Sequence, residues 1–323
     1  LDGAENVAAI ADTGYSVASD WFFQMVFCAT AISIVSGACA ERIKVWPFMI
    51  FAAIMTGIIY PIYGSWTWGG GWLAEMGFSD FAGSTIVHSV GGWAAVVGCL
   101  ILGPRAGKYS SDGKISPIAG ANMPLACLGT FILWFGWFGF NGGSQLALGT
   151  FDDAVAISSI FINTNLAACG GVMAAGIITR LMYGKTDVIQ MLNGAIGGLV
   201  AITAEPLAPS PFAAILIGAV GGLIVVFGTK LLFSFKLDDV VGAIPAHLFA
   251  GIWGTLAVPL TNADASFSAQ LIGVLSINIF VFAVSYIVWS IMKGTFGIRL
   301  SKEAETKGTD VTETGVIAYA IRD

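Results

Sequence analysis

Apolar runs of about 20 residues recur along the whole chain, and they constrain its fold more than any other feature. A helix of that length rises about 30 Å, the thickness of the hydrocarbon core of a membrane. The runs do not alternate with polar positions, as the strands of a membrane barrel would. With 56% hydrophobic and only 11% charged residues, the chain is predicted to be an all-α polytopic membrane protein. We expect about nine transmembrane helices, over residues 18–40, 45–63, 81–102, 122–146, 154–180, 187–204, 211–233, 240–260 and 269–292.

The basic residues predict how these helices cross the membrane. All fourteen Lys and Arg side chains lie around the ends of the odd-numbered helices or in the tail: Arg42, Lys44, Arg105, Lys108, Lys114, Arg180, Lys185, Lys230, Lys236, Lys293, Arg299, Lys302, Lys307 and Arg322. The charged residues of the loops after the even-numbered helices are all acidic: Glu75, Asp152, Asp153, Glu205 and Asp264. Because basic loops remain in the cytoplasm, we expect the odd-numbered helices to run inward and the tail to be cytoplasmic.

The N-terminal segment is then expected on the outer side of the membrane. It is acidic, with Asp2, Glu5 and Asp12, it begins with Leu, and residues 1–17 contain no run that could serve as an export signal. An outside start without such a signal predicts that the chain is N-terminally incomplete. We therefore expect residues 1–292 to form an incomplete transmembrane domain and residues 293–323 to form its cytoplasmic tail.

The chain has only two histidines, and they lie in equivalent places of a repeated pattern. Four residues of the segment 80–92 have identical counterparts 159 positions later: Asp80 and Asp239, Gly83 and Gly242, His88 and His247, and Gly92 and Gly251. The two copies fall on the third and eighth predicted helices, which cross the membrane in opposite directions. This arrangement indicates an inverted repeat, whose functional site is usually near the middle of the membrane.

The same spacing predicts that the two imidazoles are neighbours. His88 follows Asp80 by eight residues, or ~12 Å along a helix, and His247 is equally far along its own helix from the opposite side. Two such depths nearly meet within a core of ~30 Å. Two interpretations remain open, because buried histidines either link helices or mark a transport path. The repeat, the opposite directions and the matched depth favour the path.

Neither a metal nor a cofactor is predicted. Two imidazoles are too few protein ligands, and the nearest acid on each helix is two turns away. The five cysteines lie within apolar runs and form no CxxC pair, which indicates packing rather than a disulfide framework. No nucleophile and base have a spacing suited to catalysis, so the chain is not expected to be an enzyme.

Segments along nearly the whole chain resemble the ammonium transporter (Amt/Rh) family. They are FFQMVFCATAISIVSGACAERIK at 22–44, WGGGW at 68–72, DFAGSTIVH at 80–88, GWFGFNGGS at 136–144, NGAIGGLVAITA at 193–204, DDVVGAIPAHLFAGIWGTLAV at 238–258 and GTDVTETGVIAY at 308–319. The resemblance implies a family fold of eleven spans, of which the third matches the first helix here. It also implies a homotrimer with one pore per subunit that transports ammonium or ammonia across the cell membrane.

The resemblance assigns roles to three pairs of residues: the twin histidines of the pore (His88, His247), the outer recruitment site (Trp68, Ser144) and a phenylalanine gate beneath it (Phe27, Phe140). A tryptophan ring attracts a cation, and a serine hydroxyl can accept a hydrogen bond from ammonium. Without the family, Trp68 is interpreted as an interfacial aromatic residue and the two phenylalanines as ordinary packing residues.

Five further residues are expected to support this site: Gln24, Asp80, Trp137, Asn193 and Asp239. Each aspartate precedes an apolar helix, where capping and helix anchoring are favoured over direct contact with a ligand. Gln24 and Asn193 are expected to hydrogen-bond between helices. Trp137 is expected almost one turn deeper than the gate.

We expect ammonium to lose a proton before it crosses, because a dry pore cannot offset the desolvation of an unpaired charge. Facing imidazoles can donate hydrogen bonds to the neutral amine and accept them from it. The alternatives are an Rh-like channel for small neutral solutes and a sensor that binds ammonium but conducts little. The pair of Trp68 and Ser144 and the tail favour the Amt branch, and a sensor would be expected to carry a fused signalling domain.

The C-terminal tail also resembles that of the family. In the family it folds across neighbouring subunits and takes part in regulation, which implies a PII-type signalling protein as a partner at the cytoplasmic face. Thr314 stands where many members have histidine, and this departure weakens the implication. Ammonium and the lipid bilayer are the other expected partners, and no nucleic acid is expected.

Overall fold

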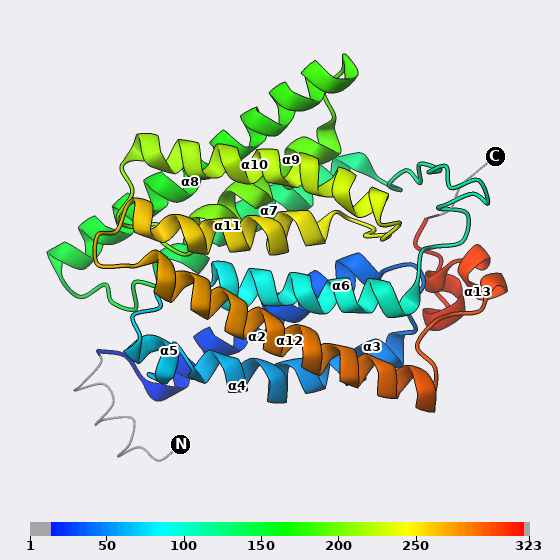
Figure 1. Ribbon diagram of the computed structural model, residues 1–323, viewed down its shortest axis with the longest axis horizontal. Helices are drawn as coiled ribbons and strands as arrows, with labels where there is room; N and C mark the ends of the chain where they lie inside the picture. The colour runs from blue at the N-terminus through cyan, green and yellow to red at the C-terminus, as the bar shows by residue number, and fades with distance from the viewer. Residues whose placement is uncertain (1–13, 320–323) are drawn as a thin grey trace.

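The computed structural model describes residues 14–319, and their regular structure is helical (Figure 1). The predictions that concern Asp2, Glu5, Asp12 and Arg322 lie outside the described part of the chain. The long segments are α2 (Val17–Cys39), α3–η1–α4 (Val45–Ile54, Met55–Ile59 and Tyr60–Ser65), η2–α6 (Ser84–Ser89 and Val90–Leu102), α7 (Met123–Gly143), α8 (Phe151–Tyr183), α9 (Val188–Ile202), α10 (Pro211–Ser234), η3–α11–η4 (Ile244–Phe249, Ala250–Ala257 and Val258–Leu260) and α12 (Phe267–Thr295). The short helices are α5 (Trp72–Glu75), α13 (Lys302–Lys307) and η5 (Asp310–Thr314).

Each predicted helix is present, with its ends within a few residues of the predicted ones. Seven segments of the described chain are long and apolar enough to cross a membrane. The remaining two, Val188–Ile202 and Ile244–Leu260, are apolar but shorter. The all-α polytopic fold is therefore confirmed, and complete crossing by the two shorter segments stays a prediction.

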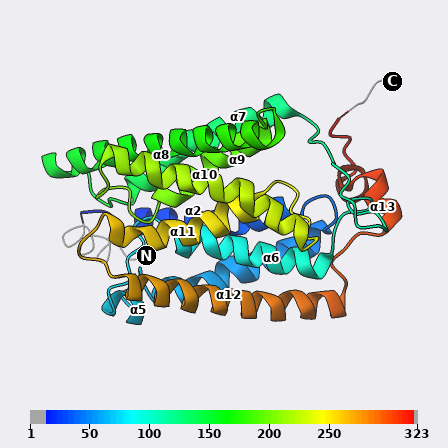
Figure 2. The same ribbon diagram turned by 45° about the horizontal axis from the view of Figure 1, so that its top comes forward.

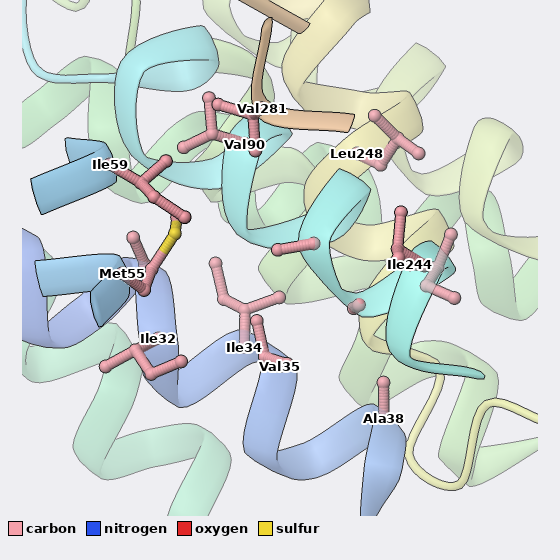
Figure 3. Close-up of a cluster of buried hydrophobic side chains, with 14 of the residues drawn as sticks. Ile32, Ile34, Val35, Ala38, Met55, Ile59, Val90, Ile244, Leu248 and Val281 are labelled. Atoms are coloured by element: carbon pink, nitrogen blue, oxygen red, sulfur yellow. The ribbon is translucent and has the colours of Figure 1, made fainter. Parts of the chain in front are cut away.

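The helices lie side by side along the long axis, with α5 at one end of the molecule and α13 at the other (Figures 1 and 2). On one side α8, α9 and α10 pack against one another, while α2, α6 and α12 belong to a second group. Figure 3 shows buried side chains of this second group, where Ile34 of α2, Val90 of α6 and Leu248 of η3 share one core. The segments η2 and η3 contact each other between the two groups.

The segments η2–α6 and η3–α11 run in opposite directions and cross at very short range (Figure 1). Two glycines permit this approach. A Cβ atom on Gly92 would lie 2.5 Å from the Cβ atom of Leu248, and one on Gly251 would lie 2.3 Å from the carbonyl oxygen of Ser84. Since small residues let membrane helices approach backbone to backbone, these glycines of the repeated pattern set the distance between the two copies.

Both copies begin later than the sequence predicts, at Ser84 rather than residue 81 and at Ile244 rather than residue 240. The reason is local. Gly83 and Gly242 have φ of 107° and 77°, in the left-handed region, and so neither continues a right-handed helix. Only Ser84–His88 of the interval from Asp80 to His88 is therefore helical, and the prediction of a helix that begins at residue 81 was wrong.

An ion cluster ties together the end of the molecule that holds α13. Arg105 donates from Nε and Nη2 to the two carboxylate oxygens of Asp238, at 2.8 and 3.0 Å, and from Nη1 to Glu41 at 2.8 Å. Burial raises the pKa of Asp238, but hydrogen bonds from Arg105 hold that pKa below its usual range. The contact therefore stabilises the fold above a pH of about 4 and is lost as the pH falls further. From the sequence, Arg105 was used only to predict the orientation of the helices. The ion cluster was not predicted, because the partners of Arg105 are distant in the chain.

The tail packs against the same end. Arg299 donates to the carbonyl oxygens of Leu102 and Pro104, at 2.6 and 2.8 Å, and pairs with Glu305 at 2.8 Å. Glu305 also accepts a hydrogen bond from the backbone N–H of Ala106 at 2.7 Å. These contacts attach α13 to the loop that follows α6.

Replacing Gly251 with Val should force η2 and α11 apart, because the new side chain would overlap the Ser84 carbonyl oxygen. We expect the free energy of unfolding to fall by about 1–3 kcal/mol, measured as a lower melting temperature of the purified protein in detergent. Gly136→Ala on α7 is the matched control, because a Cβ atom there meets nothing within 4 Å. Equal melting temperatures for Gly251→Val and the wild type would contradict the close crossing.

Candidate functional site

Two imidazoles meet where the copies of the repeat cross. The Nδ1 atoms of His88 and His247 are 3.2 Å apart, and the ring centroids are 5.2 Å apart with 22° between the ring planes. When both rings are neutral, this hydrogen bond requires one Nδ1 to carry a proton and the other to accept it. The pair then holds opposite tautomers, with one Nε2 as an acceptor and the other Nε2 as a donor.

Each histidine lies on a π-helical turn, His88 on η2 and His247 on η3. Such turns are rare and often occur at functional sites. Both are followed directly by an α-helix, so the two copies share the irregularity as well as the residues. Apolar periodicity cannot distinguish one π-helical turn from an α-helical turn, and the sequence therefore predicted two ordinary helices.

The aspartates of the repeat cap these turns. Asp80 accepts four backbone hydrogen bonds: Oδ1 from Gly83 and Ser84, at 2.9 and 2.8 Å, and Oδ2 from Thr85 and Ile86, at 2.8 and 2.9 Å. Asp239 does the same with fewer donors, accepting from Gly242 at 3.1 Å and from Ile244 at 2.7 Å. The first N–H groups of a helix have no partner within the helix, so these carboxylates anchor the start of each histidine-bearing segment. This is the capping interpretation of the two residues.

Aromatic rings cover the histidine pair on the α5 side. Phe27 and Phe140 stack with centroids 4.3 Å apart, and Phe140 lies 5.3 Å from the ring of His88. Trp137 stacks on His88 at 4.9 Å, and its Nε1 donates to Thr203 at 2.8 Å. Phe27 is 2% exposed, so the stacked pair is buried between the imidazoles and the α5 end of the molecule.

A pocket of about 180 Å³ lies against this stack on the α5 side, and its lining includes Trp68, Ser144 and Gln24. We call it the outer pocket, because the charge pattern predicts that this end of the molecule faces outward. The indole Nε1 of Trp68 donates to the Asp80 carbonyl oxygen at 2.9 Å, which fixes the ring. Ser144 donates its only hydroxyl proton to the Phe140 carbonyl oxygen at 2.8 Å, so its oxygen remains an acceptor. Gln24 makes no side-chain hydrogen bond with another described residue, in contrast to the predicted bond between helices.

A second cavity, of about 380 Å³, lies on the α13 side, and Asn193, Asp239 and Pro245 line it. Asn193 donates to the carbonyl oxygen of Val241 at 2.9 Å. This bond joins α9 to the segment before η3. Gln24 and Asn193 therefore belong to cavities on opposite sides of the histidine pair.

Within residues 14–319, no group of three or more His, Cys, Asp or Glu side chains is arranged to hold a metal ion. Sequence reasoning missed three parts of the site: the π-helical turns, the ring of Phe23 at 4.7 Å from Phe27, and Asp20 in the wall of the outer pocket. Asp20 could have been identified from the sequence, because it is an acidic residue at the start of a helix and on the side predicted to face outward.

Comparison with known proteins gives a consistent result. The sequence model of the Ammonium Transporter Family matches residues 3–319. The chain is 42% identical to ammonium transporter Amt2 of Archaeoglobus fulgidus, over 93% of this chain and 69% of that protein. It is 39% identical to the putative ammonium transporter sll0537 of Synechocystis, over 93% of this chain and 60% of that protein.

Solved structures have the same fold. One titled Sensor Amt Protein superimposes with a TM-score of 0.87 at 37% identity, covering 92% of this chain and 76% of that chain. Mep2 of Candida albicans superimposes with a TM-score of 0.78 at 29% identity, covering 86% of this chain and 65% of that chain.

The fold and the matches define a multi-pass membrane protein of the transporter class. The chain belongs to the Ammonium Transporter Family. It spans 69% and 60% of the length of the two curated relatives described above.

Replacing Asp80 with Asn should weaken the start of η2, because the amide NH2 group would face two of the four N–H donors. We expect a loss of about 1–3 kcal/mol in the free energy of unfolding, measured by thermal melting in detergent. The control is Asp112→Asn in an exposed loop, where the loss of the solvent-screened pair with Lys114 should leave the melting temperature close to that of the wild type. Equal losses in the two variants would contradict the capping role of Asp80.

Proposed function

We propose that this protein transports ammonium across the cell membrane as neutral ammonia, along the line from the outer pocket to the histidine pair. The proposal rests on one observation: an unbroken series of ring contacts runs from Trp68 in the outer pocket to His247. The centroid distances are 5.7 Å from Trp68 to Phe27, 4.3 Å from Phe27 to Phe140, 5.3 Å from Phe140 to His88 and 5.2 Å from His88 to His247. Both curated relatives are named as ammonium transporters, which supports the same function.

Capture takes place in the outer pocket. Trp68 offers its ring to a cation, an attraction of roughly 1–2 kcal/mol in a partly desolvated site. The oxygen of Ser144 offers a lone pair to an N–H group of ammonium. Neither contact holds a hydrated ion closely, so the pocket favours a small ion that donates hydrogen bonds.

Passage requires the stack of Phe27 and Phe140 to open briefly. Apolar constrictions exclude hydrated ions, because the ions lose their water and receive no polar partner in return. Ammonium therefore gives a proton to water in the outer pocket, and ammonia enters. The buried imidazole pair offers one donor and one acceptor to this neutral solute.

The proton can follow through the pair. A proton taken up at the accepting Nε2 and one released at the donating Nε2 exchange the tautomers of His88 and His247 across their Nδ1 contact. Ammonia then reaches the cavity on the α13 side, near Asn193 and Asp239, where it takes up the proton released by the histidine pair and becomes ammonium again.

The orientation belongs to the same proposal. The loops near α13 hold Arg42, Arg105 and Lys108, and this basic character supports a cytoplasmic position for that end. We assign residues 14–292 to the transmembrane domain and the later residues to a cytoplasmic tail. Family resemblance supports a homotrimer and docking of a PII-type protein at this face.

Transport itself is tested in liposomes that contain the full chain. An inward ammonium gradient should change the lumenal pH faster than in empty vesicles, and a potassium gradient of the same size should not carry comparable current. The measurements are a lumenal pH dye and electrical current on a supported membrane. Flux no greater than in empty vesicles would contradict transport. If ammonium still bound under those conditions, the sensor interpretation would replace the proposal.

The two phenylalanines of the gate are expected to differ in their effect on ammonium flux. Phe140 contacts Phe27, Trp137 and His88, whereas Phe27 does not touch the imidazoles. Each aromatic pair is worth about 0.5–1.5 kcal/mol and holds the stack closed, so Phe140→Leu should ease opening and raise ammonium flux by up to about tenfold. Phe27→Leu should raise the flux less, because its ring does not touch the imidazoles. Initial rates of lumenal pH change give the comparison.

Phe138→Leu is the control for the gate, because its ring packs against Phe161 on the other side of α7. It should keep the wild-type rate. Equal rates in Phe138→Leu and Phe140→Leu would show that the stacked rings are not on the transport path.

A further inference from the structure

One lining residue of the outer pocket carries a formal charge. The pocket is lined by apolar and aromatic side chains together with Tyr15, Asp20, Gln24 and Ser144. Among these described lining residues only Asp20 has an acidic side chain, and none of them is Lys or Arg. The carboxylate therefore gives the pocket a negative potential that is not neutralised by its own walls.

The position of Asp20 on α2 places this charge above the gate. Asp20, Gln24 and Phe27 follow one another at intervals of four and three residues, so they share one face of the helix. All three line the pocket. At 1.5 Å per residue, Asp20 lies about 10 Å from Phe27 along the helix axis. The face thus presents a carboxylate first, then an amide, then the ring that closes the path.

Asp20 is not needed to cap its helix. Ser16 is the N-cap of α2, and its Oγ accepts a hydrogen bond from the N–H of Ser19 at 3.1 Å. The carboxylate of Asp20 makes no hydrogen bond or ion pair with another residue of the described chain, and its side chain is half-buried at the pocket wall. A charged group without a structural partner in the wall of a pocket is available to a ligand.

We propose that Asp20 is a positioning residue for cation capture, which raises the local concentration of ammonium or a small alkylammonium ion in the outer pocket. The inference rests on the proposed transport function and adds to it the group that sets the apparent affinity. Charge alone does not separate ammonium from potassium, so this selection stays with Ser144, Trp68 and the phenylalanine stack. Asp20 therefore affects capture, and the rings affect passage.

The test compares Asp20→Asn, Asp20→Glu and the wild type in liposomes, with initial rates measured over a range of ammonium concentrations. An attraction of about 1 kcal/mol, as for two charges at close range in water, corresponds to about a fivefold change in affinity. Asp20→Asn should therefore raise the half-saturating concentration about fivefold while the maximal rate stays within about twofold. Asp20→Glu should restore a value near that of the wild type.

Ionic strength separates an electrostatic role from a structural one. The Debye length falls from about 30 Å at 0.01 M salt to about 8 Å at 0.15 M. The difference between Asp20→Asn and the wild type should shrink over that range, with a membrane-impermeant salt on both sides. Asp152→Asn is the matched control, because Asp152 is an exposed acid in the first turn of α8 and does not line the pocket. It should leave the half-saturating concentration unchanged.

Several outcomes would overturn the inference. An unchanged half-saturating concentration in Asp20→Asn, with the wild type transporting normally, would reject the role of Asp20 and leave the transport proposal intact. The same rejection follows if Asp20→Asn and Asp20→Glu lose melting temperature equally and share one altered, salt-independent affinity. If the wild type transports nothing, calorimetric titration with methylammonium decides: weaker binding to Asp20→Asn supports the inference, and equal binding rejects it.

Discussion

The close crossing of η2–α6 and η3–α11 is the constraint on which the rest of the site depends. Glycine at 92 and 251 lets the two backbones pack in direct contact. This close packing places the imidazoles of His88 and His247 within hydrogen-bonding distance. Larger residues would separate the rings and leave two buried polar groups without partners, which costs free energy in an apolar interior. The packing and the chemistry are therefore set by the same contact.

Much of the fold could be predicted from the sequence, because the strongest physical signal of a membrane helix is the length of an apolar run. The repeated pattern also predicted that the histidines are close, and the geometry agrees with that expectation. The exact start of each copy could not be predicted. A glycine in a sequence is compatible with a helix or with a left-handed turn. In the structure the turn is held by local hydrogen bonds from the N–H groups of Gly83 and Gly242 to the aspartates three residues before them.

Other parts of the site depend on residues that are far apart in the chain. The bidentate pair of Arg105 and Asp238 joins the end of α6 to the segment before η3, and no local pattern links the two residues. Phe27 and Phe140 were singled out among twenty-two phenylalanines by family resemblance alone. Their stacking supports that assignment, but hydrophobic periodicity gave no reason to prefer them.

The proposed path has a simple physical order. Charge and polar acceptors occupy its outer opening, aromatic rings occupy the constriction, and neutral hydrogen-bonding groups occupy the centre. Each stage suits a different state of the solute: a hydrated cation, a desolvated molecule and a neutral amine. If the stages are separate in this way, a single side chain at the opening can alter capture without altering the later steps.

The most direct measurement is a double-mutant cycle on the two histidines, with the initial rate of ammonium-driven lumenal pH change as the readout. The account predicts that His88→Ala and His247→Ala each slow transport. It also predicts that the double variant is no slower than the more damaging single variant, because the hydrogen-bonded rings act as one unit. Losses that add to within about 0.5 kcal/mol of activation free energy would show that the histidines act independently, and would contradict the account.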